Sequence, residues 1–442
     1  MHMPASAVNG AIVPPAAAAG SGTDDQLAAL AWRRLAPERW PVPPDAFPPG
    51  TALVGGAVRD ALLNRLTARP DLDLVLPGDA IGLCRQLRRR HGGSAVVLDA
   101  ERSIARLVID GWSVDLARQE GSSLMADLHR RDYTINAMAL PLATPHTLVD
   151  PLGGAGHLAT AKLVAVSEAN LLDDPLRLLR GLRLAGELSF RVEPRSLAWI
   201  QRHHTRLGQV AGERVLAELE KLAAATAGEQ ELAAVLRYRL LQPWRAADPA
   251  SAADELLLTR LKGEAAAHLG LSAAETTAAL PLARLAAMLD GPSLRALRSS
   301  RRLQQRVERL RYWRQRLGDS APAQRAAALA ELERLQLQRQ LESDLPALLL
   351  GWPACDSDAA RDWLHRWRDN EDPLFHPRAA IDGGSLQREL QLQASPQLGT
   401  LLEQLMLERA FGRLHNRDEA VSLARQWLES ANNDGARAPR HD

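Results

Sequence analysis

The sequence predicts a small α/β head with a mixed sheet and covering helices, followed by an elongated all-α neck, body and tail. Two observations support this prediction. Up to about residue 165, short apolar runs with strand-like alternation are separated by turns and helical segments. From about residue 168 to 430, nearly every segment is rich in Leu, Ala and Arg with a period near 3.6 residues, broken by Pro and Gly.

The predicted head begins with 51–58, "TALVGGAV", which is typical of a strand that runs into a Gly-Gly turn. A helical pattern, "VRDALLNRL", follows directly. The segment 71–80, "DLDLVLPGDA", alternates like a strand and ends in a turn. Three further short strands are predicted in "AVVLDA", "IARLVIDG" and "SVDLAR".

The change in pattern along the chain sets the expected domain boundaries. Residues 1–24 have no basic region before their apolar run, and prolines interrupt that run, so we expect a disordered leader and not a signal peptide. The other expected segments are the head at 25–165, the neck at 166–225, the body at 226–370, the tail at 371–430 and a disordered end at 431–442.

Composition excludes several classes of protein. The 54 basic and 53 acidic residues give a net charge of +1, so no overall positive field attracts nucleic acid. The two cysteines, Cys84 and Cys355, are far apart in sequence, which argues against a disulfide framework and a cysteine-based zinc site. No run of eighteen uncharged apolar residues occurs, so we expect no membrane segment and a cytoplasmic protein.

Arginine gathers in one stretch of the predicted body. Residues 295–316 contain nine Arg and one Glu. On a helix they would form a basic stripe that could follow an RNA backbone. However, all but three of the basic residues in this chain are Arg, so an ordinary solvated helix face is an equal alternative.

Gly55 and Gly56 lie between a predicted strand and a predicted helix. Glycine allows the backbone to approach a ligand closely, and N–H groups near the start of a helix bind phosphate. Arg59, one turn into the helix, could reach the same anion. A Gly-Gly turn without a ligand would have the same sequence, so this motif alone leaves both interpretations open.

Asp71 and Asp73 are two residues apart on a predicted strand, so their side chains should point to the same face. Their charges repel each other, and a divalent cation between them would remove the repulsion. The alternative is a strand face exposed to water. Asp115, on another predicted strand, is a candidate third carboxylate. An aspartate pair after a phosphate-binding turn indicates metal-assisted nucleotidyl transfer.

Asp174, Arg177, Arg180 and Arg183 recur at intervals of three residues. Residues three apart are neighbours on a helix, but the row drifts by about 60° per step, so we expect Asp174 to act with Arg177. A carboxylate can accept from the N4 amine of cytosine while a guanidinium donates to N3 and O2, and adenine offers a similar pair of groups. Such a pair could select C and A, although a salt-bridged helix face would use the same residues.

The segment 130–140, "RRDYTINAMAL", places charged and amide groups at the start of an apolar run. Either these groups form a solvated turn before a core segment, or they face a charged ligand. Together and in this order, the motifs resemble those of class II tRNA nucleotidyltransferases and bacterial poly(A) polymerases, within the polymerase β-like superfamily. The matching segments are "LVGGAVRDALLNR", "DLD", "RRDYTINA", "DDPLRLLRGLR" and "GERVLAELEKL".

The resemblance implies the polymerase β-like fold for the head and a role for most candidate residues. It implies Asp71 and Asp73 for two Mg²⁺ ions, Gly56 and Arg59 for the triphosphate, Arg131 for the incoming nucleotide, and Asp174 and Arg177 for the base, assisted by Arg180 and Arg183. Two candidates come from the sequence pattern alone: Gly55 from the Gly-Gly turn, and Asp115 as a further catalytic carboxylate, for which an exposed strand aspartate is an equal alternative. Glu213 and Arg214 are expected to brace the base-reading helix and not to touch the substrate.

The resemblance also bears on which nucleotide is added. Residues 119–129, "QEGSSLMADLH", which we call the connector, separate the strand at 113–118 from the basic motif. Family members that finish the CCA end have a much longer flexible loop there, linked to switching from CTP to ATP, and members without that loop add only two cytidines. We therefore expect a Mg²⁺-dependent enzyme that adds CC from CTP to the 3′ end of tRNA, with a separate enzyme adding the final A.

Three alternatives remain open at this level. Within the family these are complete CCA addition, with ATP as a further substrate, and an A-adding enzyme or poly(A) polymerase. From another class, the chain could be a catalytically inactive RNA-binding protein that kept the scaffold. The intact pair Asp71 and Asp73 argues against inactivity.

Overall fold

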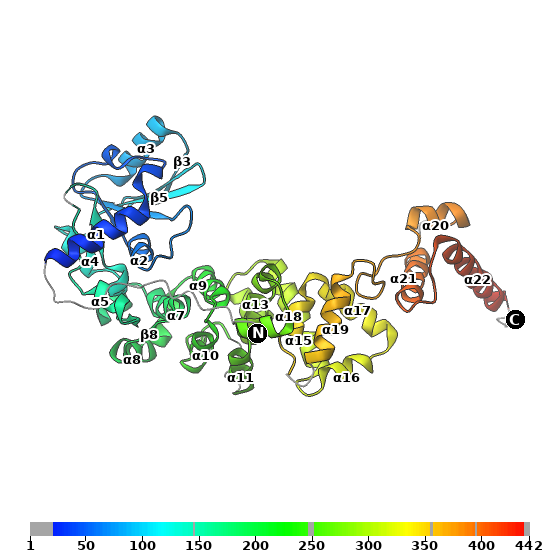
Figure 1. Cartoon of the computed structure of the whole chain (residues 1–442). Helices are drawn as coiled ribbons and strands as arrows, with labels where there is room; N and C mark the ends of the chain where they lie inside the picture. The colour runs from blue at the N-terminus through cyan, green and yellow to red at the C-terminus, as the bar shows by residue number, and fades with distance from the viewer. Residues whose placement is uncertain (1–20, 145, 246–251, 354–356, 394–395, 437–442) are drawn as a thin grey trace, which may run out of the picture. The chain divides into compact units, whose positions relative to one another are not determined.

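The structure is a computed structural model that describes residues 21–144, 146–245, 252–353, 357–393 and 396–436. The chain divides into two compact units (Figure 1). The first comprises Met1–Glu218 and Tyr238–Pro243, and the second comprises Leu219–Arg237 and Trp244–Asp442. The α/β part lies in the first unit, and the second is helical, which confirms the predicted fold class. The finer division into neck, body and tail stays a prediction.

The head is built on one mixed six-stranded sheet; the sequence patterns predicted five of its strands, and the strand at 139–141 was not predicted. The two inner strands that carry the candidate carboxylates run parallel to each other, whereas the other neighbouring pairs are antiparallel. In sheet order, the strands are β3 (Ser94–Asp99), β4 (Ile104–Ile109), β5 (Trp112–Arg118), β2 (Leu72–Leu76), β1 (Ala52–Val54) and β6 (Ala139–Pro141).

Inner strand β2 explains why the aspartate pair stands out. Its apolar residues Leu72, Leu74, Val75 and Leu76 are all buried, because the strand has a neighbour on each side and packed side chains on each face. Asp73 is the one half-buried residue of the strand. A carboxylate in the middle of an otherwise apolar strand is costly without a partner.

Three helices pack in the head. α1 (Ser21–Leu35) lies against α2 (Gly56–Leu62), and α3 (Ala80–His91) covers β3, β4 and β5. Asp79 caps α3 by accepting a hydrogen bond from the N–H of Ile81. A short helix, α4 (Leu124–His129), follows β5, and the 3₁₀ turn η3 (Thr134–Asn136) leads into β6.

The rest of the first unit is mostly helical. Its two-stranded sheet pairs β7 (Lys162–Leu163) with β8 (Arg191–Val192). Tyr133 lies fully buried against Gly181 of α7: a Cβ atom on this glycine would lie 2.0 Å from the tyrosine hydroxyl. The helices of this part are α5 (Gly154–Ala159), α6 (Glu168–Asp173), α7 (Leu176–Leu188), α8 (Pro194–Arg202) and the start of α9 (Gly212–Ala224).

The second unit contains the end of α9 and the helices that follow it. Fully buried Arg284 donates to the carbonyl oxygens of Ala223, Ala225 and Leu261 and pairs with Glu229 at 3.0 Å. This pairing ties three helix ends together. The helices are α10 (Glu229–Arg237), α11 (Ala252–Arg260), α12 (Gly263–Leu269), α13 (Ala273–Met288), α14 (Gly291–Ala296), α15 (Arg301–Leu317), α16 (Pro322–Ala327), α17 (Glu331–Leu341), α18 (Leu345–Leu349), α19 (Ser357–Arg368), α20 (Gly383–Leu390), α21 (Pro396–Ala410) and α22 (Arg417–Ala436).

The arginine stripe of residues 295–316 is largely used inside this unit. Arg306 forms a salt bridge with Asp344 at 2.6 Å, and Arg316 pairs with Glu333 at 3.0 Å. Four more of the nine pair with or donate to other groups of the unit. At least six of the nine arginines thus have partners within the unit, and RNA binding by the stripe stays a prediction. No helix within the described ranges is long and apolar enough to cross a membrane.

Helices extend into both of the segments that were expected to be disordered. α1 begins at Ser21, inside the expected leader at 1–24, and α22 runs to Ala436, beyond 430. A helix extends easily once nucleated, because each added residue gains one hydrogen bond. Residues 1–20 and 437–442, and also Cys355, lie outside the described residues, whereas Cys84 is a buried free thiol.

Candidate functional site

The turn between β1 and α2 brings three of the predicted motifs together. Gly55 has a φ of +73°, which residues with side chains rarely adopt. A Cβ atom on Gly55 would lie 3.5 Å from Arg131 Nη1 and 3.5 Å from Asp73 Oδ2. The glycine turn, the aspartate pair and the basic motif therefore meet at one place.

The aspartates concentrate negative charge beside this turn. The parallel pairing of β2 and β5 places Asp73 opposite Asp115, while Asp71 is exposed just before β2. Burial, the largest cause, and the charges of Asp115 and Asp71 together raise the pKa of Asp73 to about 6 against the opposing charges of Arg131 and Arg106. At neutral pH the Asp73 carboxylate is ionised in surroundings that oppose its charge.

Asp115 differs from the other two because its charge is balanced. Arg106, its cross-strand neighbour on β4, donates to both carboxylate oxygens, from Nε at 2.6 Å and from Nη2 at 2.7 Å. Such a two-pronged pair fixes the carboxylate geometry. In this structure Asp115 is turned toward the arginine, and its role as a catalytic carboxylate stays a prediction.

The carboxylates of Asp71 and Asp73 repel each other, and a divalent cation bound to both would remove this repulsion. Within the described part of the chain, neither carboxylate has a hydrogen bond or salt bridge. Among the same residues, no group of three or more His, Cys, Asp or Glu side chains could hold a metal ion. Mg²⁺ commonly binds one or two carboxylates and completes its shell with water and substrate phosphates. A site with two protein carboxylates, whose coordination is completed by substrate phosphates and water, would match this coordination of Mg²⁺.

Arg59 is already engaged within the head. It donates to both oxygens of Asp60, at 2.8 and 2.9 Å, and to Asn136 Oδ1 at 2.8 Å. Its Nη2 lies 3.6 Å from the position of a Cβ atom on Gly56, so the guanidinium stays beside the turn. Arg59 thus links the glycine turn to the basic motif, and its predicted contact with the triphosphate is untested.

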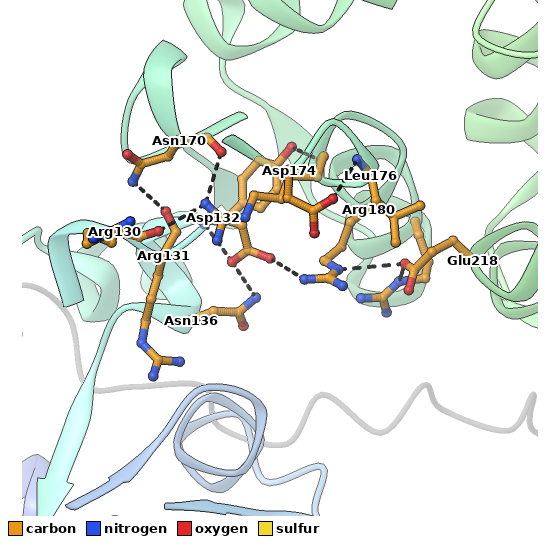
Figure 2. A network of polar contacts seen from close by, with 12 residues as sticks. Arg130, Arg131, Asp132, Asn136, Asn170, Asp174, Leu176, Arg180 and Glu218 are labelled. Atoms are coloured by element: carbon orange, nitrogen blue, oxygen red, sulfur yellow. Dashed lines mark hydrogen bonds and ion pairs between the residues drawn. The ribbon is translucent and has the colours of Figure 1, made fainter. Parts of the chain in front are cut away.

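Arg131 is held at both its side chain and its backbone. Asp127 Oδ2 accepts from its Nε at 3.3 Å and its Nη2 at 3.0 Å. Buried Asn170 donates to the carbonyl oxygens of Arg131 and His129, both at 2.7 Å. Figure 2 shows the Arg131 side chain pointing away from the contacts around Asp132 and Arg180. Nη1 is the guanidinium nitrogen directed at Gly55.

Asp132, the neighbour of Arg131, points inward instead. Its buried carboxylate accepts from the Tyr133 N–H at 2.7 Å, from Asn136 at 3.3 Å and from Arg180 at 3.3 Å (Figure 2). Burial alone would raise the pKa of Asp132, but Arg180 and the Tyr133 N–H outweigh burial, and the pKa lies below its usual value. At Asp132 the start of 130–140 is therefore not a solvated turn, because this carboxylate is buried and braces the core, whereas the contact of Arg131 with a charged ligand stays a prediction.

The row on α7 is anchored residue by residue. Asp174 accepts from the Leu176 N–H at 3.3 Å and pairs with Arg214 at 2.9 Å. Arg177 Nη1 donates to the carbonyl oxygens of Arg130 and Asn170, both at 2.9 Å. Asp174 and Arg177 thus have separate partners. The contact of Arg214 supports its expected bracing role.

The buried carboxylate of Glu218, which the sequence pattern did not single out, binds the arginines at the end of this row. Glu218 of α9 pairs with Arg183 at 2.5 Å and lies 3.9 Å from Arg180. Arg183 also pairs with Glu187. The drift of the row around α7 explains these different partners, because successive arginines face successive neighbours. The sequence feature that indicates this contact is an acidic residue on the apolar face of α9, because a buried acidic residue is usually paired with a cation.

Two protein-family models match the chain. The model described as the poly A polymerase head domain matches residues 51–164, which contain the glycine turn, the aspartate pair and the basic motif. The model described as a probable RNA and SrmB-binding site of polymerase A matches residues 189–244.

Similarity to characterised relatives extends over nearly the whole chain. A CC-adding tRNA nucleotidyltransferase of Synechocystis is 32% identical over 444 residues, covering 90% of this chain and 98% of the relative. This chain belongs to the tRNA nucleotidyltransferase and bacterial poly(A) polymerase family. A CC-adding tRNA nucleotidyltransferase of Thermus thermophilus is 30% identical, with 90% and 97% covered. An A-adding tRNA nucleotidyltransferase of Deinococcus radiodurans is 45% identical over 158 residues, which cover 36% of this chain and 35% of the relative.

Solved structures of family members share the fold of this nucleotidyltransferase. The Thermotoga maritima CCA-adding enzyme complexed with tRNA superposes with a TM-score of 0.64 at 20% identity, covering 86% of this chain and 91% of that one. The Bacillus stearothermophilus CCA-adding enzyme in complex with CTP gives 0.63 at 21% identity, covering 87% and 94%. At these identities the likeness concerns the fold alone.

Proposed function

We propose that this nucleotidyltransferase adds two cytidines from CTP to the 3′ end of tRNA and leaves the final A to a separate enzyme. The observation that carries the proposal is the folded connector at 119–129. Its second half is α4, and its first half is fastened at both ends: the Gln119 N–H donates to the Leu76 carbonyl at 2.8 Å, and Ser123 caps α4.

Such a connector has little freedom to act as a lever on the base-reading residues. Glu120 donates its N–H to Asp127 at 3.0 Å and pairs with Arg130 at 3.3 Å. The family resemblance links ATP use to a long flexible loop at this place. The two relatives that match nearly the whole chain, from Synechocystis and Thermus thermophilus, are both called CC-adding enzymes, which supports the same choice.

The chemistry is a displacement at phosphorus. In the proposal the 3′-hydroxyl oxygen of the tRNA attacks the α-phosphate of CTP, a phosphodiester forms, and pyrophosphate leaves. Asp71 and Asp73 would hold Mg²⁺, which when bound neutralises charge on the triphosphate and favours ionisation of the hydroxyl, in the manner of two-metal sites. Gly55, Gly56 and Arg59 would hold the triphosphate beside this charge, and Arg131 would contact the incoming nucleotide.

The base would be read at the start of α7. Asp174 would accept from the N4 amine, and Arg177 would supply donors to N3 and O2. Both side chains are held by neighbours in the structure, so little ordering is needed on binding. Arg180 and Arg183 would assist by keeping α7 in place.

The test is extension of a tRNA that lacks its CCA end. The protein is incubated with this tRNA, Mg²⁺ and each nucleotide in turn and then with CTP and ATP together, and the 3′ ends are sequenced. We expect two C and no A. Addition of CCA, or of A to a tRNA that ends in CC, would assign the chain to the CCA-adding or A-adding alternative. No product with any nucleotide would favour an RNA-binding protein without activity.

A further inference from the structure

We propose that Asp127 is a positioning residue. Its carboxylate holds the Arg131 guanidinium at the nucleotide site and also accepts a hydrogen bond from the connector backbone at Glu120. The inference rests on the proposed function, because it takes Arg131 as a contact of the incoming CTP. It adds a residue that the family motifs quoted above do not include.

The first observation is that the two carboxylate oxygens of Asp127 accept hydrogen bonds from different groups. Oδ1 accepts from the Glu120 N–H at 3.0 Å, and Oδ2 accepts from Arg131 Nε at 3.3 Å and Nη2 at 3.0 Å. The side chain of Asp127 is only 9% exposed. A buried carboxylate with donors on both oxygens has one favoured orientation, and charge-assisted bonds of this kind are stronger than neutral ones.

The second observation is what this orientation does to Arg131. With Nε and Nη2 bound to Asp127, the remaining nitrogen, Nη1, points at the turn and lies 3.5 Å from the position of a Cβ atom on Gly55. Asp73 Oδ2 lies at the same distance from that position. Asp127 therefore directs one donor of Arg131 to the place where the glycine turn and the metal-binding pair meet.

The third observation is that the backbone beneath Arg131 is fixed independently. Asn170 binds the carbonyl oxygen of Arg131 and that of His129, and Arg177 binds the carbonyl oxygen of Arg130. Loss of Asp127 would consequently free the side chain of Arg131 without releasing its backbone. The expected result is weaker nucleotide binding in a protein that stays folded.

The experiment compares CTP affinity among matched variants by titration calorimetry with Mg²⁺ present. Asp127→Asn keeps an acceptor for the Glu120 N–H but loses the charge that holds Arg131. We expect its Kd for CTP to rise about tenfold, the effect of one charge-assisted hydrogen bond. Arg131→Ala should raise Kd at least as much. The control Glu120→Gln keeps the backbone N–H and should stay within about twofold, since it alters only a partly exposed ion pair.

The double variant separates positioning from a merely structural role. If Asp127 acts through Arg131, Asp127→Asn should add little to the Kd of Arg131→Ala, because the group it positions is already gone. Additive effects of the two changes, an unchanged Kd for Asp127→Asn, or an unchanged Kd for Arg131→Ala would each overturn the inference. The extension assay on the unaltered protein decides the proposed function separately, because it does not depend on either variant.

Discussion

The aspartate pair of the head and the charged row of α7 differ in how their charges are balanced. Asp174, just before α7, and Arg177, Arg180 and Arg183 on α7 each have a hydrogen-bonding partner within the first unit. In the head, the carboxylates of Asp71 and Asp73 have no hydrogen bond or salt bridge among the described residues.

This difference shows which part of the site is complete without ligand. A charge with internal partners is held in place before substrate arrives, so the row proposed to read the base is preorganised. The half-buried carboxylate of Asp73 has no hydrogen bond or salt bridge among the described residues, and a bound cation would favour its ionisation beyond the effect of Arg131 and Arg106. The base-reading region is therefore expected to behave as part of the core, and the aspartate pair as a binding site. Three predictions test this contrast.

The largest effect is expected in the head, on activity. Asp73→Asn should lower nucleotidyl transfer by about 10³-fold, because the metal supplies several kcal/mol of transition-state stabilisation. Its free energy of unfolding in urea should not fall, since the change removes a charge that has no internal partner. Single-turnover extension of tRNA lacking CCA measures the first quantity.

Asp45→Asn, at an exposed aspartate of the same unit, is the matched control and should retain activity. Binding of tRNA, measured by filter retention, should be nearly unchanged in both variants. Retained transfer by Asp73→Asn would remove this residue from the metal site, and a large loss of stability would contradict the contrast.

The second effect is expected in the charged row, on stability. Glu218→Gln removes the charge that Arg183 and Arg180 share, and it should lower the free energy of unfolding by about 2 kcal/mol because Arg183 then keeps only Glu187, and Arg180 only Asp132, as an anionic partner. Urea denaturation measures this loss. Glu220→Gln, an exposed position on the same helix, should change stability by less than about 0.5 kcal/mol. Equal stability of the two variants would show that the network contributes nothing.

The third effect is a difference in pH dependence between two carboxylates of the first unit, measured by urea denaturation in chelator-treated buffer. The pKa of Asp73 is raised to about 6, so the folded state binds this proton more tightly than the unfolded state. The contribution of Asp73 to stability should therefore fall as the pH rises from about 4 to about 6. Asp73→Asn should gain stability relative to the unaltered protein over that range.

Asp132 should behave in the opposite way. Its pKa lies below the ordinary 3.8, so its stabilising contribution is present above that pH and is lost as the pH falls through the lower folded-state pKa. The deficit of Asp132→Asn should be largest near neutral pH and shrink in acid. If the stabilities of the two variants changed with pH in the same direction, the claim that partners compensate the charge of Asp132 but not that of Asp73 would be wrong.

Much of this arrangement was predictable because it follows from local patterns. The alternation in 71–80 predicts the strand that β2 forms, and the glycines at 55 and 56 predict the turn between β1 and α2. The interval of three residues from Arg177 to Arg183 matches one helix, α7, whereas Asp174 lies just before it, at the end of α6. Helix ends were less predictable, since α1 and α22 extend into segments expected to be disordered.

The partners of the charged groups could not be predicted in the same way. Arg106 neutralises Asp115 through the register of β4 and β5, and Glu218 reaches Arg183 from a helix 35 residues further along the chain. Asp127 binds Arg131 from one helical turn away, but nothing local shows that the guanidinium then points at Gly55. These contacts depend on how elements pack, which local patterns do not encode.

The sequence by itself determined the types and the order of the chemical groups: a glycine turn, an aspartate pair, a basic motif and a row of arginines, together with the strands and helices that carry them. Only the tertiary structure decided which of these charges are satisfied within the protein and which are left to bind something else. The physical reason is that secondary structure follows from spacing along the chain, whereas the balance of a buried charge depends on neighbours that the chain brings together from a distance.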